Sequence, residues 1–303
     1  MGLRGIRAPV REERVTSADG TSIGYYVVGS GPRRWLMPPA MGAPVVSMKH
    51  LLERFAAEYT IVTWDQRGFY RSGDPPDRDA MRVDDHLRDM EAVVAAERLD
   101  GRFVLGGWSM AVPISLEYYR RRPADVRALV LISGPYERAL SSVAKAPRAE
   151  ALALAALRAA ARVRGVLNPL SRRVLAARGM GRVLHRAGLV AENPEHVEEI
   201  LADFSQVDWG HYFTMTRHLH AHSAADVLGE VRVPTLIATG THDMVTPRDV
   251  AERMHARIGG SELFVVPRAT HYIVAEFPEL LGVRIAEFLG RVPWDEIASR
   301  ATE

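Results

Sequence analysis

The sequence lacks cysteine altogether, which excludes disulfides, thiolate metal ligands and a cysteine nucleophile. It also lacks any run of 18 or more apolar residues, so no transmembrane helix is predicted. The first residues carry charges but no apolar segment of the kind found in secretion signals, and a cytoplasmic protein is expected. Lysine is nearly absent, since Lys49 and Lys145 are the only lysines among 39 basic residues. Arginine therefore carries almost all of the positive charge.

Positive charge gathers in one part of the chain. Residues 138–191 hold eleven Lys or Arg and a single acid, Glu150, whereas the whole chain has a net charge of only +2. Such asymmetry can steer anionic ligands or an acidic carrier protein, and it can equally reflect arginine used as the ordinary solvating residue. The segment has no nucleic-acid-binding motif and no interleaved aromatic residues, so no nucleic-acid partner is expected. No membrane partner is expected either, because the chain has no spanning segment.

Short apolar segments alternate with amphipathic ones along most of the chain. Asp19-Gly20 predicts a two-residue turn in an N-terminal β-hairpin, because this pair tolerates positive φ. Further strands are predicted at 34–38, 59–65, 103–107, 127–133, 233–240 and 262–267, and helices at 43–57, 84–98, 110–122, from 247 and from 278. This alternation predicts an α/β fold, a doubly wound and mostly parallel sheet with helices on both faces.

Residues 138–226 interrupt the alternation, because they contain no convincing strand. Helices are predicted at 148–163, 169–178, 194–204 and 208–221, separated by glycines and Asn-Pro pairs. We therefore expect a core formed by residues 1–137 and 227–303, with 138–226 inserted as a helical cap.

The segment GWSMA places a serine, Ser109, between a predicted strand and a predicted helix. A serine on such a turn can act as a nucleophile when a base takes its proton and an acid orients the base. Asp243 comes just past the penultimate strand and His271 just past the last one. Because the carboxyl ends of parallel strands share one edge, these side chains are expected to meet there. Taken singly, each has an ordinary structural explanation, and Glu137 is a second candidate acid.

Together with the loop DQRGFYRS at 65–72, these motifs resemble those of the α/β-hydrolase superfamily over most of 20–137 and 227–291. GWSMA looks like the carboxylesterases of that superfamily, whereas DQRG is similar to its prolyl iminopeptidase-like members. The resemblance implies that Ser109 attacks an acyl carbon, that His271 moves its proton, and that Asp243 holds the imidazole. No cofactor is expected. Asp65 and Arg67 are expected to brace their turn rather than touch the substrate.

The predicted oxyanion hole departs from the superfamily pattern. Many members carry His-Gly after the third strand, where this chain has LMPPAMG. Proline has no amide hydrogen, so the donors are expected to be the N–H groups of Ala40, with Met41 next, and of Met110.

Three side chains are candidates for substrate binding: Met41, Tyr136 and Trp209, the last together with its neighbours in the cap. Simple helix packing is the alternative for Trp209. The cap also holds a group of histidines, of which His218 and His222 have a spacing that zinc ligands can use. Since no H-E-x-x-H motif accompanies His211, His218, His220 and His222, no metal site is expected.

The resulting prediction is a serine hydrolase that acts on a small-molecule carboxylic ester, lactone or thioester. Three alternatives stay open: an aminopeptidase-like amide hydrolase, acyl transfer or lactonisation in a biosynthetic pathway, and a non-catalytic ligand-binding member of the fold. The amide hydrolase needs a carboxylate for the substrate's α-ammonium group. Acyl transfer would use the basic segment to dock an acidic carrier protein.

Overall fold

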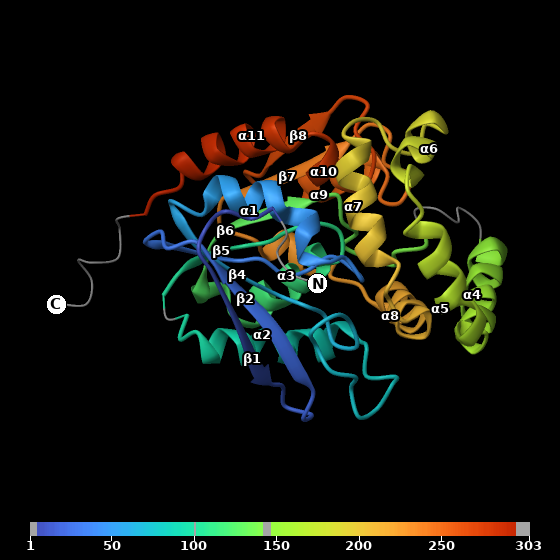
Figure 1. Cartoon of the computed structure of the whole chain (residues 1–303). Coiled ribbons are helices and arrows are strands. Elements are labelled where there is room, and N and C mark those ends of the chain that lie inside the picture. The colour runs from blue at the N-terminus through green and yellow to red at the C-terminus, as the bar shows by residue number, and fades with distance from the viewer. Residues whose placement is uncertain (1–4, 100, 142–146, 295–303) are drawn as a thin grey trace.

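A twisted eight-stranded sheet lies at the centre of the structure, a computed structural model that describes residues 5–99, 101–141 and 147–294 (Figure 1). The strand order is β1-β2-β4-β3-β5-β6-β7-β8, and only the β1–β2 and β2–β4 pairs are antiparallel. The strands are β1 Val10–Thr16, β2 Ser22–Val28, β3 Arg33–Leu36, β4 Tyr59–Trp64, β5 Phe103–Leu105, β6 Val126–Ile132, β7 Thr235–Gly240 and β8 Glu262–Val266. The predicted, mostly parallel sheet is confirmed.

Helices cover both faces of the sheet, and each face has its own apolar core. On one face, Leu87 of α2 packs in a core with residues of α3 and α9, and on the other Leu52 of α1 packs with residues of α11. The doubly wound arrangement is therefore confirmed. The helices of this layer are α1 Lys49–Phe55, α2 Val83–Ala96, α3 Ala111–Arg121, α9 Arg248–Arg257, α10 Ile273–Glu276 and α11 Pro278–Gly290, with 3₁₀ turns η1 Val45–Met48, η2 Pro123–Asp125 and η3 Val227–Glu230.

Five further helices lie between β6 and β7 in sequence and extend beyond the sheet in Figure 1: α4 Pro147–Arg162, α5 Arg164–Leu175, α6 Met180–Arg186, α7 Pro194–Phe204 and α8 Trp209–Ala221. Three of them match the predicted helices closely. The prediction for α5 was wrong, because this helix begins at Arg164 and contains Pro169, which was taken as its start. α6 was not predicted. Within the described residues, no helix is both long and apolar enough to cross a membrane.

The first hairpin turns differently from the prediction. Strands β1 and β2 pair as far as Thr16 and Ser22, and the Ser17 N–H then donates to the Thr21 carbonyl at 2.8 Å. Residues 18–20 form the loop, in which Gly20 donates to Ser17 at 2.9 Å and has a φ of +88°. The predicted two-residue turn was wrong, because the chain makes a longer turn closed by a left-handed glycine.

Candidate active site

Ser109 lies on a sharp turn between β5 and α3. Its φ of +60° is left-handed, which costs a residue other than glycine about 1–3 kcal/mol. Backbone hydrogen bonds hold the turn, since the Ser109 N–H donates to Ile132 at 2.8 Å and the Ile132 N–H donates to Gly107 at 3.0 Å. A Cβ added at Gly107 would lie 2.9 Å from the Pro38 carbonyl oxygen and 3.1 Å from the Ala111 methyl group. The methyl of Ala111, at the position that is glycine in the G-x-S-x-G pattern, is thus accommodated because Gly107 has no side chain.

Loops that follow three different strands bring Ser109, His271 and Asp243 together. His271 Nε2 lies 3.0 Å from Ser109 Oγ, and His271 Nδ1 lies 2.9 Å from Asp243 Oδ2. The indole N–H of Trp108 donates to the His271 carbonyl at 2.8 Å, so the residue before Ser109 also fixes the histidine loop. Glu137, the second candidate acid, is exposed and has no contact with His271 in the described residues.

The carboxylate of Asp243 is buried and well supplied with donors. It accepts the N–H of Val245 at 2.9 Å, the N–H of Thr246 at 2.8 Å and the Thr246 hydroxyl at 2.8 Å. Burial by itself raises the pKa of Asp243, but the charge and hydrogen bond of His271, together with these donors, outweigh it and leave that pKa below its usual value. An ionised carboxylate at Nδ1 orients the imidazole so that Nε2 faces the serine.

The two segments expected to supply oxyanion donors follow two neighbouring strands, β3 and β5. Ala40 and Met110 are buried, with 6% and 1% exposed surface. In the part of the chain that the structure describes, the backbone N–H groups of Ala40, Met41 and Met110 donate to no acceptor. That these N–H groups bind a ligand oxygen stays a prediction. Met110 also precedes an 11-residue helix, whose first turn favours negative charge.

A sequence model described as alpha/beta hydrolase fold matches residues 40–278. The chain belongs to this family. It is 27% identical over 284 residues to the serine hydrolase BPHL of Mus musculus, an alignment that covers 91% of this chain and 87% of the relative. It is 24% identical over 297 residues to a proline iminopeptidase of Thermoplasma volcanium, covering 88% and 92%. Among solved structures, a thermophilic esterase from Thermogutta terrifontis superposes with a TM-score of 0.74 at 21% identity, covering 93% of this chain and 99% of the esterase.

One buried side chain of this α/β hydrolase joins the two donor segments, and sequence reasoning did not single it out. Gln66 is 2% exposed; its Oε1 accepts the Gly42 N–H at 2.7 Å, and its Nε2 donates to Met110 Sδ at 3.3 Å. The Gly42 carbonyl in turn accepts the Tyr70 hydroxyl at 2.7 Å. Gln66 therefore links the loop after β3 to the turn that carries Ser109. The DQRG motif contained this residue, but spacing alone does not reveal its partners.

Two of the candidate substrate-binding residues lie where the helices inserted between β6 and β7 meet the loop after β3. The Thr216 hydroxyl of α8 lies 3.6 Å from Met41 Sδ. Trp209 belongs to a cluster of cap aromatic rings in which its ring centroid lies 5.2 Å from that of Tyr212. A Cβ added at Gly42 would lie 3.0 Å from the Tyr212 ring, so this cluster rests directly on the loop after β3. Contact of Met41 and Trp209 with a substrate stays a prediction.

Tyr136, the third candidate, lines a cavity to which Ser109, Asp243 and His271 do not contribute. It is 2% exposed, and Arg253 Nε of α9 lies 3.3 Å from its hydroxyl oxygen. Together with Asp249 and Glu137 these residues line a cavity of about 390 Å³. A role of Tyr136 in binding substrate stays a prediction.

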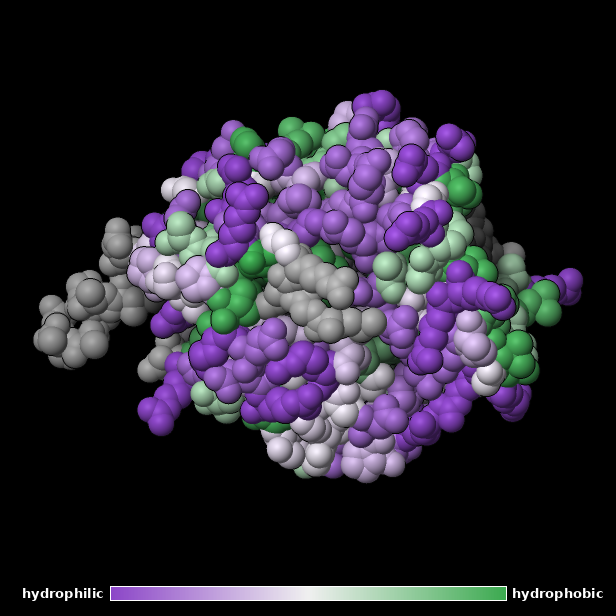
Figure 2. Space-filling model, in the orientation of Figure 1, coloured by the Kyte–Doolittle hydropathy of each residue, from purple (hydrophilic) through white to green (hydrophobic). Residues whose placement is uncertain are grey.

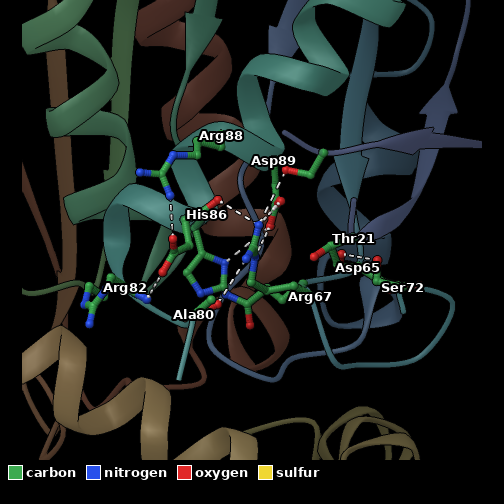
Figure 3. A network of polar contacts seen from close by, with 12 residues as sticks. Thr21, Asp65, Arg67, Ser72, Ala80, Arg82, His86, Arg88 and Asp89 are labelled. Carbon is green, nitrogen blue, oxygen red and sulfur yellow. Dashed lines mark hydrogen bonds and ion pairs between the residues drawn. The ribbon is translucent and has the colours of Figure 1, made fainter. Parts of the chain in front are cut away.

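Arg67 of the DQRG loop is enclosed by protein (Figure 3). Its side chain has no exposed surface, and its guanidinium donates to Asp89 at 2.8 and 2.5 Å and to Asp19 at 2.7 Å. His86 lies beside it with neither ring nitrogen hydrogen-bonded in the described residues, and burial lowers the pKa of His86 to about 3. Asp65 accepts the Tyr26 hydroxyl at 2.7 Å, and burial raises the pKa of Asp65 to about 6. Both side chains, Asp65 and Arg67, therefore bind protein groups that hold the loop, as expected.

The four cap histidines are dispersed rather than convergent. Each lies beside a different acceptor: His211 3.4 Å from the Gly68 carbonyl, His218 3.1 Å from Asp79, His220 2.7 Å from Glu150 and His222 3.4 Å from Glu117. Among the described residues, no group of three or more side chains could hold a metal ion.

Proposed function

We propose that the protein is a serine hydrolase that cleaves a carboxylic ester, lactone or thioester through an acyl-enzyme. The observation that carries the proposal is the continuous contact from Ser109 Oγ to His271 Nε2, at 3.0 Å, and from His271 Nδ1 to Asp243, at 2.9 Å. Hydroxyl, base and orienting acid in this relation are what nucleophilic catalysis by serine requires.

In the proposed reaction, His271 Nε2 takes the Ser109 proton while Oγ forms a bond to the acyl carbon. The carbonyl oxygen gains the negative charge, and the N–H groups of Ala40 and Met110 donate to it. When the bond to the leaving group breaks, His271 returns the proton to that group. A water molecule then attacks the acyl carbon while His271 takes its proton. His271 returns that proton to Ser109 Oγ as the acid is released, which restores Ser109.

The surroundings favour an apolar substrate. Met41 has a flexible apolar side chain that can adapt to an acyl or alcohol portion, and the aromatic cluster around Trp209 lies next to its loop. Residues 138–226 would act as a cap that closes over the bound ester and excludes bulk water.

Turnover of short p-nitrophenyl esters tests the proposal. Ser109→Ala should abolish hydrolysis above the uncatalysed rate. Ser133→Ala is the matched control, because Ser133 also follows a strand with positive φ, at +40°, yet makes no contact with His271 in the described residues. Full activity of Ser109→Ala, or equal loss in both variants, would reject the proposal.

An aminopeptidase-like amide hydrolase is the second candidate, because one relative is a proline iminopeptidase and the DQRG motif is similar to that group. The charges of that motif, Asp65 and Arg67, are occupied by protein partners, which weakens this reading. Comparing kcat/KM for aminoacyl arylamides and simple esters separates the two candidates, and a preference for the arylamides would favour the second.

A further inference from the structure

Exposed aliphatic side chains gather on three cap helices. Eleven large hydrophobic residues are exposed in the described part of the chain. Seven of them lie on the stretch from α4 to the loop that follows α6, with 44–71% of their surface exposed: Leu152, Val163, Val166, Leu170, Val174, Val183 and Leu189. On α5, the residues Val166, Leu170 and Val174 recur every fourth position and therefore share one side of the helix. This side faces away from the protein.

Arginines surround these apolar residues. Eight of them are exposed on the same stretch: Arg148, Arg158, Arg162, Arg172, Arg173, Arg178, Arg182 and Arg186. The arginines of this region that form ion pairs in the described residues are Arg138, with Glu150, and Arg164, with Asp208; none of the eight exposed arginines is paired with a carboxylate there. Figure 2 shows green apolar side chains beside purple ones along the margin where Figure 1 places α4 and α5. We call the exposed side chains of residues 148–189 the cap ridge.

We propose that the cap ridge docks on the surface of an anionic lipid bilayer. Unpaired arginines are attracted by lipid phosphates and by the negative potential of such a surface, and their aliphatic stems let them lie along it. Exposed Val and Leu side chains between the arginines can then enter the boundary between headgroups and acyl chains. The sequence-based expectation of no membrane partner rested on the lack of a spanning segment, which surface docking does not need.

Other occupants fit the cap ridge less well. A second copy would place two surfaces of like charge against each other. Residues 147–190 contain no Phe, Tyr or Trp, whereas the centres of protein interfaces are enriched in these residues, which argues against an acidic protein partner. A nucleic acid would attract the arginines but would leave the exposed Val and Leu side chains uncovered.

The cap ridge is joined to α8, the helix whose Thr216 contacts the candidate substrate-binding residue Met41. Helices α4 and α5 both pack on α8, and Asn168 Oδ1 of α5 accepts the N–H of Trp209 at 3.0 Å. Docking would thus hold this end of the cap against the lipid, from which an apolar ester could enter. This last step rests on the proposed function, whereas the docking itself does not.

Flotation with lipid vesicles tests the docking. The Ser109→Ala variant is used, so that the outcome is independent of catalysis and distinguishable from failure of the proposed function. We expect it to float with vesicles in which about a third of the lipid is phosphatidylglycerol, to bind neutral phosphatidylcholine vesicles at least about tenfold more weakly, and to be released as salt rises.

Two pairs of variants assign the binding to the cap ridge. Arg172→Gln with Arg173→Gln should weaken binding to the anionic vesicles by about tenfold or more, and Val166→Ser with Leu170→Ser should weaken it as well. The matched controls lie elsewhere on the surface and should bind unchanged: Arg34→Gln with Arg122→Gln, and Leu280→Ser with Val283→Ser on α11.

The proposal is wrong if the protein ignores anionic vesicles, binds neutral ones equally well, or is weakened as much by the control pairs. It is also wrong if an acidic carrier protein binds in solution and vesicles do not, because the partner would then be that protein.

Discussion

The Asp243→Asn substitution probes the proposed mechanism at a single atom, since it exchanges one carboxylate oxygen for an NH₂ group of the same size. Oδ1 of Asp243 accepts two backbone N–H groups, those of Val245 and Thr246, so the amide oxygen must stay there. The NH₂ group then faces Nδ1 of His271, where Oδ2 now lies at 2.9 Å. The imidazole must accept this hydrogen bond and carry its own proton on Nε2, where it cannot take the Ser109 proton.

The size of the effect follows from this change of tautomer. A fall in kcat of about 10⁴ is expected, as such substitutions produce in serine enzymes, which corresponds to about 5.4 kcal/mol of lost transition-state stabilisation. The melting temperature should change little, because both backbone hydrogen bonds remain. Thr246→Val, the matched control, removes one 2.8 Å hydrogen bond from the carboxylate but keeps its charge, and about tenfold in kcat should be lost.

The assay is kcat for a p-nitrophenyl ester at pH 7, with a thermal melt of each variant. If Asp243→Asn keeps more than about a tenth of the wild-type kcat and melts normally, the carboxylate does not set the tautomer of His271 and the reasoning fails.

Three further predictions concern the DQRG loop. Gln66→Leu should lower kcat about tenfold or more with little change in KM, because Gly42 and Met110 lose the amide that hydrogen-bonds to both. A change confined to KM would contradict this. Because the pKa of Asp65 is raised to about 6 in the folded protein, this group makes the free energy of unfolding of the wild type fall as pH rises from about 4 to 6. At pH 7, Asp65→Asn should therefore be more stable to urea than the wild type by up to about 3 kcal/mol, and the difference should shrink below pH 6. No difference at pH 7 would count against the raised pKa. Arg67→Met should lower the free energy of unfolding by about 3–5 kcal/mol in the same assay, because Asp89 is left buried and unpaired. Adding Asp89→Leu should restore part of that loss. A double variant no more stable than the single one would disprove the pairing.

The meeting of Ser109, Asp243 and His271 could be predicted from sequence because it depends only on where strands end. Each of the three follows a strand of the parallel part of the sheet, and all such ends lie on one edge. Their positions along the chain therefore determine their neighbourhood in space, although 162 residues separate Ser109 from His271.

Features that depend on side-chain reach or on local compensation could not be predicted. The partners of Gln66 lie 24 and 44 residues away and contact it through an amide whose direction no periodicity reveals. Pro169 is a strong helix-breaking signal, yet α5 continues through it, since the helix packs on α7 and α8. In the first hairpin, Asp19-Gly20 indicated the correct place, but the extra residue in the loop is decided by the hydrogen bond between Ser17 and Thr21.

Mapping the site of covalent modification by a fluorophosphonate tests the central claim most directly. The proposed mechanism predicts that the phosphonyl group is found on Ser109 in the wild-type protein and that His271→Ala, while still folded, is not modified at a comparable rate. Modification of a different residue, or undiminished modification of Ser109 without His271, would contradict it.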